Sequence, residues 1–403
     1  MSDRRLENRV LIWVCLLVGI NQLGFGAIVP VLPQYAQSFG VSVSAIGMAT
    51  GIYGLARFLL AAPAGGMADR FGRRKALALG GLATAAGNLW CAYASSYPEF
   101  LTARFLAGAG AGLIVTTGQI VLADISPIER RGRILSIYMS AFVFSVGIGP
   151  LPGGVLAEHF GLAAPFIGFA VAGSLSGLLS WFAIPETSHM AHAAAAQVPG
   201  IRPSYGRQVQ ALARQPGFVL ACLVNLMNTA ARTGGLFSIV PLIGASRLGM
   251  SVQDIGIAMA LGLVIGLVAA YPSGVLVDYF GRKAVIVPAT IASGTALLLF
   301  CVADSPTGYI AASLVWGLAS SIGGSAPTAY AADAAPPGMN ATTLSLFRMI
   351  GDFGYVVGPI LMGVIADLAG ANAALEVVAA TMVVVAVLFA WIAPETYRRK
   401  GSG

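Results

Sequence analysis

Twelve long apolar segments, separated by short polar connections, constrain this chain more than any other feature of its sequence. An α-helix needs about 20 mainly apolar residues to cross the hydrocarbon core of a bilayer. Segments of that length lie at residues 10–33, 44–68, 76–95, 99–123, 134–157, 163–185, 217–242, 253–277, 284–303, 307–332, 342–366 and 372–393. Their mixed Leu, Ala, Gly and Val composition has no two-residue alternation, which favours helices over a β-barrel. We therefore predict an all-α membrane protein with twelve transmembrane helices.

The basic residues predict how the chain is oriented in the membrane. Only 10% of its residues are charged. If the N-terminus is cytoplasmic, the cytoplasmic segments hold 18 Lys and Arg residues and the outer loops hold only Arg247. This positive-inside bias predicts an inner or plasma membrane protein with both termini in the cytoplasm. The bias also accounts for the net charge of +7 without a nucleic acid partner.

Two related charged stretches, GGMADRFGRRK at residues 65–75 and SGVLVDYFGRK at residues 273–283, indicate an internal repeat. Asp69 and Asp278 within them are 209 positions apart (278 − 69 = 209). The same offset relates Asp124 to Asp333, Gly149-Pro150 to Gly358-Pro359, and the PET sequence at 185–187 to that at 394–396. We therefore predict two six-helix bundles of the same orientation, residues 1–187 and 216–403, joined by a cytoplasmic linker at 188–215. Two such bundles form an architecture typical of transporters.

Four motifs resemble those of a known family. The stretch at 65–75 is similar to the loop signature G-x-x-x-D-R-x-G-R-R/K of the major facilitator superfamily. LTARFLAGAGAG at 101–112 resembles its helix-four motif, whose intramembrane Arg, here Arg104, is linked to proton coupling. GIGPLPGG at 147–154 resembles its helix-five antiporter motif, and LGFGAIVPVLP at 23–33 resembles the helix-one signature of its twelve-helix branch. The chain thus resembles the twelve-helix drug:proton antiporters over essentially its whole length, which implies export of a small-molecule cargo.

The charged stretches are expected to act as gating latches between the bundles. Gly65 and Gly66 are expected to let the end of one helix approach a neighbouring backbone, and Gly72 to permit a tight turn. Asp69 can then meet the positive end of a neighbouring helix. Arg70 or Arg73 would reach an acid, which the resemblance identifies as Asp124. The repeat supplies a second latch of three residues: Asp278, Arg282 and Asp333. The simpler alternative is that the basic residues only set membrane topology.

The antiporter motif has a physical interpretation of its own. Gly149 and Gly153 are four residues apart on one helix face, so another helix can pack closely against them. Pro150 removes a backbone donor and bends the helix. The full motif comprises Gly147, Gly149, Pro150, Gly153 and Gly154. We expect it to seal the transport pathway, whereas a general glycine-rich packing seam is the alternative.

Charged side chains inside predicted spans suggest where cargo and protons bind, because each is costly in a bilayer unless paired or hydrated. Asp352 is the one acid well inside a span and is predicted to carry the proton, together with Arg348, Arg104 and Asp124. A structural Arg348–Asp352 ion pair, four residues apart on one helix, is the alternative. The predicted spans contain four arginines and one aspartate: Arg57, Arg104, Arg232, Arg348 and Asp352. Their formal charge is +3 (4 − 1), which favours anionic or zwitterionic cargo.

Polar side chains in the same spans are candidates for cargo recognition. Together with two of the arginines, the predicted substrate-binding set is Asn21, Gln22, Arg57, Gln119, Asn225, Asn228, Arg232 and Tyr355. Any one of the amides could instead hold two helices together by hydrogen bonds.

Enzymatic chemistry is not expected. The sequence has no G-x-x-x-x-G-K-S/T nucleotide-binding loop, no G-x-S-x-G or H-E-x-x-H motif and no metal-ligand spacing, so we predict no cofactor and no metal. An ion gradient or the cargo's own gradient must supply the energy. The predicted function is proton-coupled export of small amphipathic molecules by a chain that can work as a monomer. A uniporter or proton symporter importing a small organic anion, and a membrane sensor or scaffold, are the alternatives.

Overall fold

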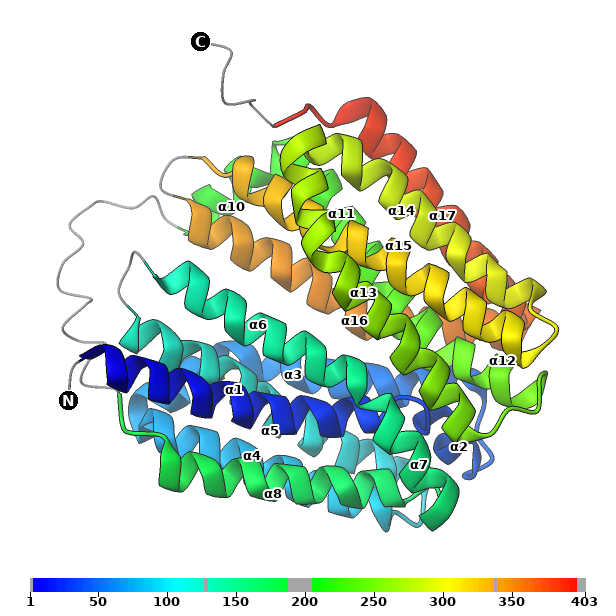
Figure 1. The fold of residues 1–403 in the computed structure, drawn as a ribbon, viewed down its shortest axis with the longest axis horizontal. Coiled ribbons are helices and arrows are strands. Elements are labelled where there is room, and N and C mark those ends of the chain that lie inside the picture. Colours follow the sequence, from blue (N-terminus) through cyan, green and yellow to red (C-terminus); the bar gives the residue numbers. More distant parts are fainter. Residues whose placement is uncertain (1–2, 127–129, 188–204, 337–338, 397–403) are drawn as a thin grey trace. The chain divides into compact units, whose positions relative to one another are not determined.

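The computed structural model of the chain describes residues 3–126, 130–187, 205–336 and 339–396, and every regular element among them is a helix (Figure 1). The prediction of an all-α protein is therefore confirmed. The elements, in chain order, are α1 (Asp3–Ile28), α2 (Leu32–Gln37), α3 (Val43–Phe71), α4 (Arg73–Ala92), α5 (Tyr97–Ile125), α6 (Arg131–Ile148), α7 (Pro150–Phe160), α8 (Ala164–Ala183), α10 (Tyr205–Ala213), α11 (Pro216–Ala230), the π-helix η1 (Ala231–Ile239), α12 (Val240–Ser246), α13 (Val252–Phe280), α14 (Arg282–Val302), α15 (Pro306–Asp333), α16 (Asn340–Ala369) and α17 (Ala371–Ile392).

Helices occupy all twelve predicted apolar segments. Among the described residues, nine helical stretches are long and apolar enough to cross a membrane. One of them runs through α6 and α7 as a single stretch, Arg133–Phe160. The three remaining segments are α4, α15 and the run of α11, η1 and α12. The multi-pass membrane class is thus confirmed, and twelve spans are consistent with the helices.

The chain forms two compact units. Unit 1 consists of Met1–Val41, Ile52–Gly200 and Ser251–Ala260, and unit 2 of Ser42–Gly51, Ile201–Met250 and Leu261–Gly403. The predicted bundle boundaries at residues 187 and 216 stay a prediction. Of the predicted linker, residues 188–204 lie outside the described part, and α10 follows them.

Small residues allow the helices of unit 1 to pack closely. α4 packs against α5 and α8, and α1 packs against α6 and α8. A Cβ added to Gly81 of α4 would lie only 2.5 Å from the Cα of Gly177 in α8. A Cβ on Gly80 would lie 2.9 Å from the carbonyl oxygen of Gly110 in α5. Backbones can approach this closely only where side chains are absent.

Aromatic side chains contribute to the core of unit 2. α14 packs against α15 and α17, and α11 packs against α16. Its largest core cluster includes the rings of Phe218, Tyr330 and Phe389. α10 joins this unit through Leu212, which is buried in the same cluster, and through Gln208, whose Oε1 accepts a hydrogen bond from Thr342 Oγ1 at 2.5 Å.

The backbone repeats the 209-residue offset of the sequence. Among the described residues, six have positive φ and all are glycines, forming three pairs at that offset: Gly40 (71°) and Gly249 (61°), Gly72 (92°) and Gly281 (97°), Gly161 (88°) and Gly370 (92°). Glycine adopts this conformation without the steric penalty of a Cβ. The repeat therefore extends from sequence motifs to the conformation of the connections.

Candidate functional site

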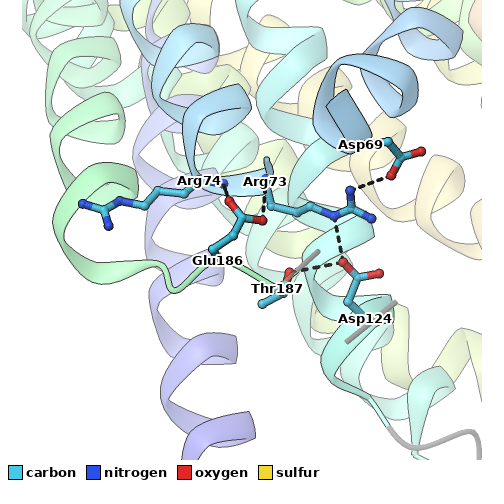
Figure 2. A network of polar contacts seen from close by, with 6 residues as sticks. All are labelled: Asp69, Arg73, Arg74, Asp124, Glu186 and Thr187. Atoms are coloured by element: carbon cyan, nitrogen blue, oxygen red, sulfur yellow. Dashed lines mark hydrogen bonds and ion pairs between the residues drawn. The ribbon is translucent and has the colours of Figure 1, made fainter. Parts of the chain in front are cut away.

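A network of polar contacts around Arg73 joins the ends of several unit 1 helices (Figure 2). Its Nε donates to Asp124 Oδ2 on α5 at 2.9 Å, and its Nη1 to Asp69 Oδ1 on α3 at 2.5 Å. Thr187 Oγ1 donates to the same Asp124 oxygen at 3.1 Å. Burial alone would lower the pKa of Arg73, but the hydrogen bonds to Asp124 and Asp69 raise it above its ordinary value. Arg73, rather than Arg70, is thus the partner of Asp124.

Glu186 completes this network by accepting hydrogen bonds from the first backbone amides of α4. The N–H of Arg73 donates to its Oε1 at 2.9 Å, and the N–H of Arg74 to its Oε2 at 3.3 Å. The first amides of a helix have no hydrogen-bond partner within the helix. A carboxylate at this end is also stabilised by the positive end of the helix dipole. Gly72 precedes α4 with φ 92°, and a Cβ on it would collide with the Glu186 carboxylate.

Two parts of this arrangement recur in unit 2 at the offset of 209, the Arg–Asp ion pair and the Glu carboxylate at the start of the next helix. Arg282 Nε donates to Asp333 Oδ2 at 2.8 Å. The backbone N–H groups of Arg282 and Lys283 donate to the Glu395 carboxylate at 3.2 and 3.0 Å. Glu186 and Glu395 were not among the residues predicted from the sequence to act in the site, although the repeated PET sequence contains both. That repeat was the signal that could have identified them.

The other residues of the predicted latches are Asp69, Arg70 and Asp278, and they differ in exposure and contacts. Asp69 lies at the surface apart from its bond to Arg73, with 68% of its side chain exposed. Arg70 is exposed, and its guanidinium lies 5.7 Å from the centre of the Phe71 ring. The side chain of Asp278 lies outside the described residues. Contact between the two bundles through these residues stays a prediction.

The expectation for Gly65 and Gly66 stays a prediction, because the backbone that they are expected to approach belongs to the other unit. Among the described residues, no heavy atom lies within 4 Å of a Cβ built on either glycine. Gly72 has the positive φ, 92°, expected of a tight turn that requires glycine.

A second polar group of unit 1 lies deep among α1, α3 and α5. Arg104 has only 1% of its surface exposed, and its guanidinium lies 4.6 Å from the centre of the Tyr53 ring. Tyr53 stacks on Phe25 of α1 with ring centroids 5.2 Å apart. Asn21, one helical turn before Phe25, therefore faces the same side of α1. This group thus combines a cation, an aromatic pair and an amide within one unit.

The amides of Asn21 and Gln22 are buried, and none of their side-chain nitrogen and oxygen atoms has a hydrogen-bond partner among the described residues. Buried polar atoms in a stable site are normally satisfied by protein, water or ligand. Arg57, one turn after Tyr53, lies where α3 approaches α5 closely, because a Cβ on Gly112 would be 3.0 Å from its Cα. Asn21 and Arg57 of the predicted substrate-binding set thus lie on helices that meet α5, which carries Arg104, a residue predicted for proton coupling.

Other predicted cargo residues have different surroundings. Gln119 Nε2 lies 3.8 Å from the Met139 sulfur, a contact between α5 and α6. Asn225 Nδ2 donates to the Phe347 carbonyl at 2.9 Å, which links α11 to α16. Asn225 thus has the contact expected of an interhelical hydrogen bond, the alternative raised for the amides.

Three further candidates lie along unit 2. Asn228 and Tyr355 are half-buried. Arg232 is exposed, whereas the eight residues that follow it are buried. It stands on the π-helical turn η1, and such turns occur often at functional sites.

Arg348 and Asp352 form the ion pair that their spacing predicted. Arg348 Nε lies 3.7 Å from Asp352 Oδ2, and 51% and 44% of the two side chains are exposed. The pair is therefore long, and both of its side chains are about half exposed.

The glycines of the antiporter motif contact other backbones directly. Built Cβ atoms on Gly149 and Gly153 would lie 2.6 Å from Gly26 Cα and 2.5 Å from Ala27 Cα in α1. One on Gly154 would lie 2.8 Å from the Cα of Gln253 at the start of α13. Pro150, which is buried like Gly147, begins α7 directly after α6 ends. The motif is therefore a tightly packed junction where α6 continues into α7.

Comparisons with known proteins agree with this architecture. The Major Facilitator Superfamily model matches residues 14–269 and 221–402. An uncharacterized MFS-type transporter of Methanocaldococcus jannaschii is 24% identical over 91% of this chain and 93% of its own. Multidrug resistance protein MdtG of Salmonella choleraesuis is 28% identical over 74% of each chain.

A solved structure has the same fold. The crystal structure of a bacterial homolog of the human lysosomal transporter Spinster is 17% identical, with a TM-score of 0.77 over 94% of this chain and 95% of that one. The twelve predicted spans, the duplicated Arg–Asp–Glu networks and the match along nearly the whole sequence lead to one conclusion. The chain belongs to the Major Facilitator Superfamily of membrane transporters.

Proposed function

We propose that this transporter is a proton-coupled exporter of small amphipathic molecules that works by alternating access, with anionic or zwitterionic cargo. It would work in the inner or plasma membrane with both termini in the cytoplasm, and a monomer would suffice. The superfamily membership establishes transport of small molecules but neither direction, coupling nor cargo.

The observation that carries the proposal is the buried polar group of unit 1. Arg104 lies over Tyr53, while the neighbouring amides of Asn21 and Gln22 have no hydrogen-bond partner among the described residues. Leaving such groups unsatisfied away from water costs several kcal/mol, on the order of 2–7 kcal/mol for one amide. A cargo with an acidic group and hydrogen-bonding atoms would satisfy them, and its apolar part would contact Tyr53 and Phe25.

The sign of the interior charge supports a cargo with an anionic group. The spans carry Arg57, Arg104, Arg232 and Arg348 against Asp352, a formal charge of +3 (4 − 1). A net positive charge in a low-dielectric interior attracts an anionic group on the cargo. Arg232, exposed on η1, is available for such a contact.

Two observations support export. The GIGPLPGG motif resembles the antiporter motif, and its glycines pack against the backbone of α1. The relative MdtG is a multidrug resistance protein. Proton coupling rests on Asp352, whose partial exposure provides access for protons, and on its neighbour Arg348.

Flux in proteoliposomes tests the proposal. A pH gradient is imposed across vesicles that contain the wild-type chain or Asp352→Asn, and proton flux is followed as organic anions or lipophilic cations are added. Export coupling predicts cargo-dependent proton flux that Asp352→Asn abolishes and that anions elicit more strongly than cations.

Each alternative predicts a different result from the same vesicles. A uniporter moves cargo without a pH gradient, and a symporter moves cargo and protons in the same direction. A sensor or scaffold binds a ligand but shows no flux. Cation dyes that compete as well as organic anions would contradict the proposed cargo class.

A further inference from the structure

Arg74 extends from the first turn of α4 away from the polar network, whereas the neighbouring Arg73 points into it (Figure 2). The central carbon of the Arg74 guanidinium lies 4.7 Å from the centre of the Trp181 ring on α8. This distance is within the roughly 6 Å of a cation–π contact. The Arg74 Nε is buried and has no hydrogen-bond partner among the described residues. Within that part of the chain, an aromatic face and not an acid holds this cation.

The two residues lie at the edge of the region expected in the membrane. Trp181 is close to the end of the candidate span Ala164–Ala183, and 44% of its surface is exposed. Arg74 comes shortly before the predicted apolar segment 76–95, on the side that the basic residues predict to be cytoplasmic. Tryptophan is enriched at membrane–water interfaces, where one part of its ring is in contact with hydrocarbon and another with polar groups. The guanidinium is therefore expected at the level of the lipid head groups.

The counterpart of Arg74 in unit 2 has a partner within the protein. Lys283, at the offset of 209, donates from Nζ to the Ala393 carbonyl at 2.8 Å. Ala393 is the C-terminal cap of α17, so this bond satisfies a carbonyl at a helix end. Trp181 corresponds to Ala390 and so has no aromatic counterpart in unit 2. Both repeats thus carry a cation at this position, but the unit 2 cation binds a helix end and the unit 1 cation stacks on an exposed ring.

We propose that Arg74 and Trp181 form a binding site for the phosphate group of an anionic membrane phospholipid. Arginine presents its donors in a planar fork that matches phosphate oxygens, and the same plane stacks on aromatic rings. Lys75, which is exposed at the next position, adds a second cation and favours an anionic lipid over a zwitterionic one.

The exposed ring favours a lipid over free phosphate as the source of that group. An indole ring has a large apolar surface, which the glycerol and upper acyl carbons of a lipid can cover. Free phosphate has no apolar part and would leave the Trp181 ring as exposed as before. The site does not depend on the proposed export function, because none of its residues belongs to the predicted cargo or proton sites.

Lipid retention tests the site in the full chain. The protein is reconstituted in vesicles of equal parts phosphatidylcholine and phosphatidylglycerol and extracted in mild detergent, and its retained lipids are measured by native mass spectrometry. The wild type is expected to retain phosphatidylglycerol in preference to phosphatidylcholine. Arg74→Gln removes the charge and should lower this retention about fivefold. Trp181→Leu should lower it as well, because the ring that holds the guanidinium is lost.

The matched control is Lys283→Gln, which removes the counterpart cation from unit 2 and should leave the retention unchanged. Inorganic phosphate added to the extracted protein should not displace the lipid, and displacement by phosphate alone would contradict a lipid site. A wild type without preference for phosphatidylglycerol would overturn the proposal, as would unchanged retention in Arg74→Gln. If Arg74→Gln unfolds at a lower temperature than the wild type, Arg74→Lys replaces it. That variant keeps the charge without the planar fork, and retention equal to that of the wild type would then overturn the site.

Discussion

Arg73 and Asp124 form a buried ion pair at 2.9 Å, and their counterparts Arg282 and Asp333 form the same pair at 2.8 Å in a more exposed setting. The side chains of the first pair are 3% and 9% exposed, and those of the second are 15% and 35% exposed. The ion pair is thus present in both repeats, but its side chains are more exposed in unit 2 than in unit 1. Because solvent screens exposed charges, the two pairs should differ in their effect on stability.

Removal of Arg73 should destabilise the protein much more than removal of Arg282. Arg73→Ala leaves Asp124 buried without its charge partner, which costs about 3–5 kcal/mol for a pair of this kind. Arg282→Ala should cost only about 1 kcal/mol, because water reaches Asp333. Thermal unfolding in one detergent, with the two variants measured side by side, checks this order. Equal losses would show that burial does not distinguish the pairs.

The turns before α4 and α14 should not tolerate a side chain. Gly72→Ala and Gly281→Ala each place a Cβ on a residue with φ above 90°, which should lower the free energy of unfolding by at least about 1 kcal/mol. Gly65→Ala is the matched control, since it lies within α3 with open space around it and should be neutral or stabilising by about 0.5–1 kcal/mol. The melting temperatures of the three variants test this prediction: Gly72→Ala and Gly281→Ala should melt at lower temperatures than the wild type, and Gly65→Ala should not.

The antiporter motif should require glycine at the positions that contact α1. Gly153→Ala would bring a Cβ against the backbone of Ala27, and backbone cannot move aside as a side chain can. We expect loss of transport and a lower melting temperature. Gly168→Ala in α8 is the control, because the nearest atom there is the flexible Leu156 Cδ1 at 3.3 Å. A Gly153→Ala protein with wild-type flux would contradict the importance of this junction.

Arg104 should not be replaceable by lysine. Its planar guanidinium covers the Tyr53 ring, an arrangement that the compact ammonium of lysine reproduces poorly. Arg104→Lys and Arg104→Gln should both reduce flux of an anionic cargo at least about tenfold, which corresponds to roughly 1.4 kcal/mol. Proteoliposome flux and cargo binding are the measurements. Full activity of Arg104→Lys would mean that charge alone is recognised.

Asp352 should matter for transport and little for folding. Its pair with Arg348 is 3.7 Å long and about half exposed, so breaking it should change the free energy of unfolding by no more than about 1 kcal/mol. Asp352→Asn should nevertheless abolish cargo-dependent proton flux. A large fall in melting temperature would instead assign the pair a structural role, the alternative that its spacing suggested.

The sequence by itself determined the helical membrane class, the duplication and the family. Hydrophobic segments of bilayer length and motifs repeated at one offset are local in the chain, so they can be recognised without a structure. The turn at Gly72 was predicted correctly for the same reason, because it depends on a short motif. Asp124 came from the family resemblance, and the sequence left its partner open between Arg70 and Arg73 until the structure showed Arg73.

Only the tertiary structure decided which groups meet across the chain. Glu186 lies 113 positions from Arg73, and its role in capping α4 depends on where helix α8 ends in space. The exposure of Asp352 likewise depends on neighbouring helices. Residue types show what a side chain can do, but burial and partners depend on packing between segments far apart in sequence, which local patterns do not contain.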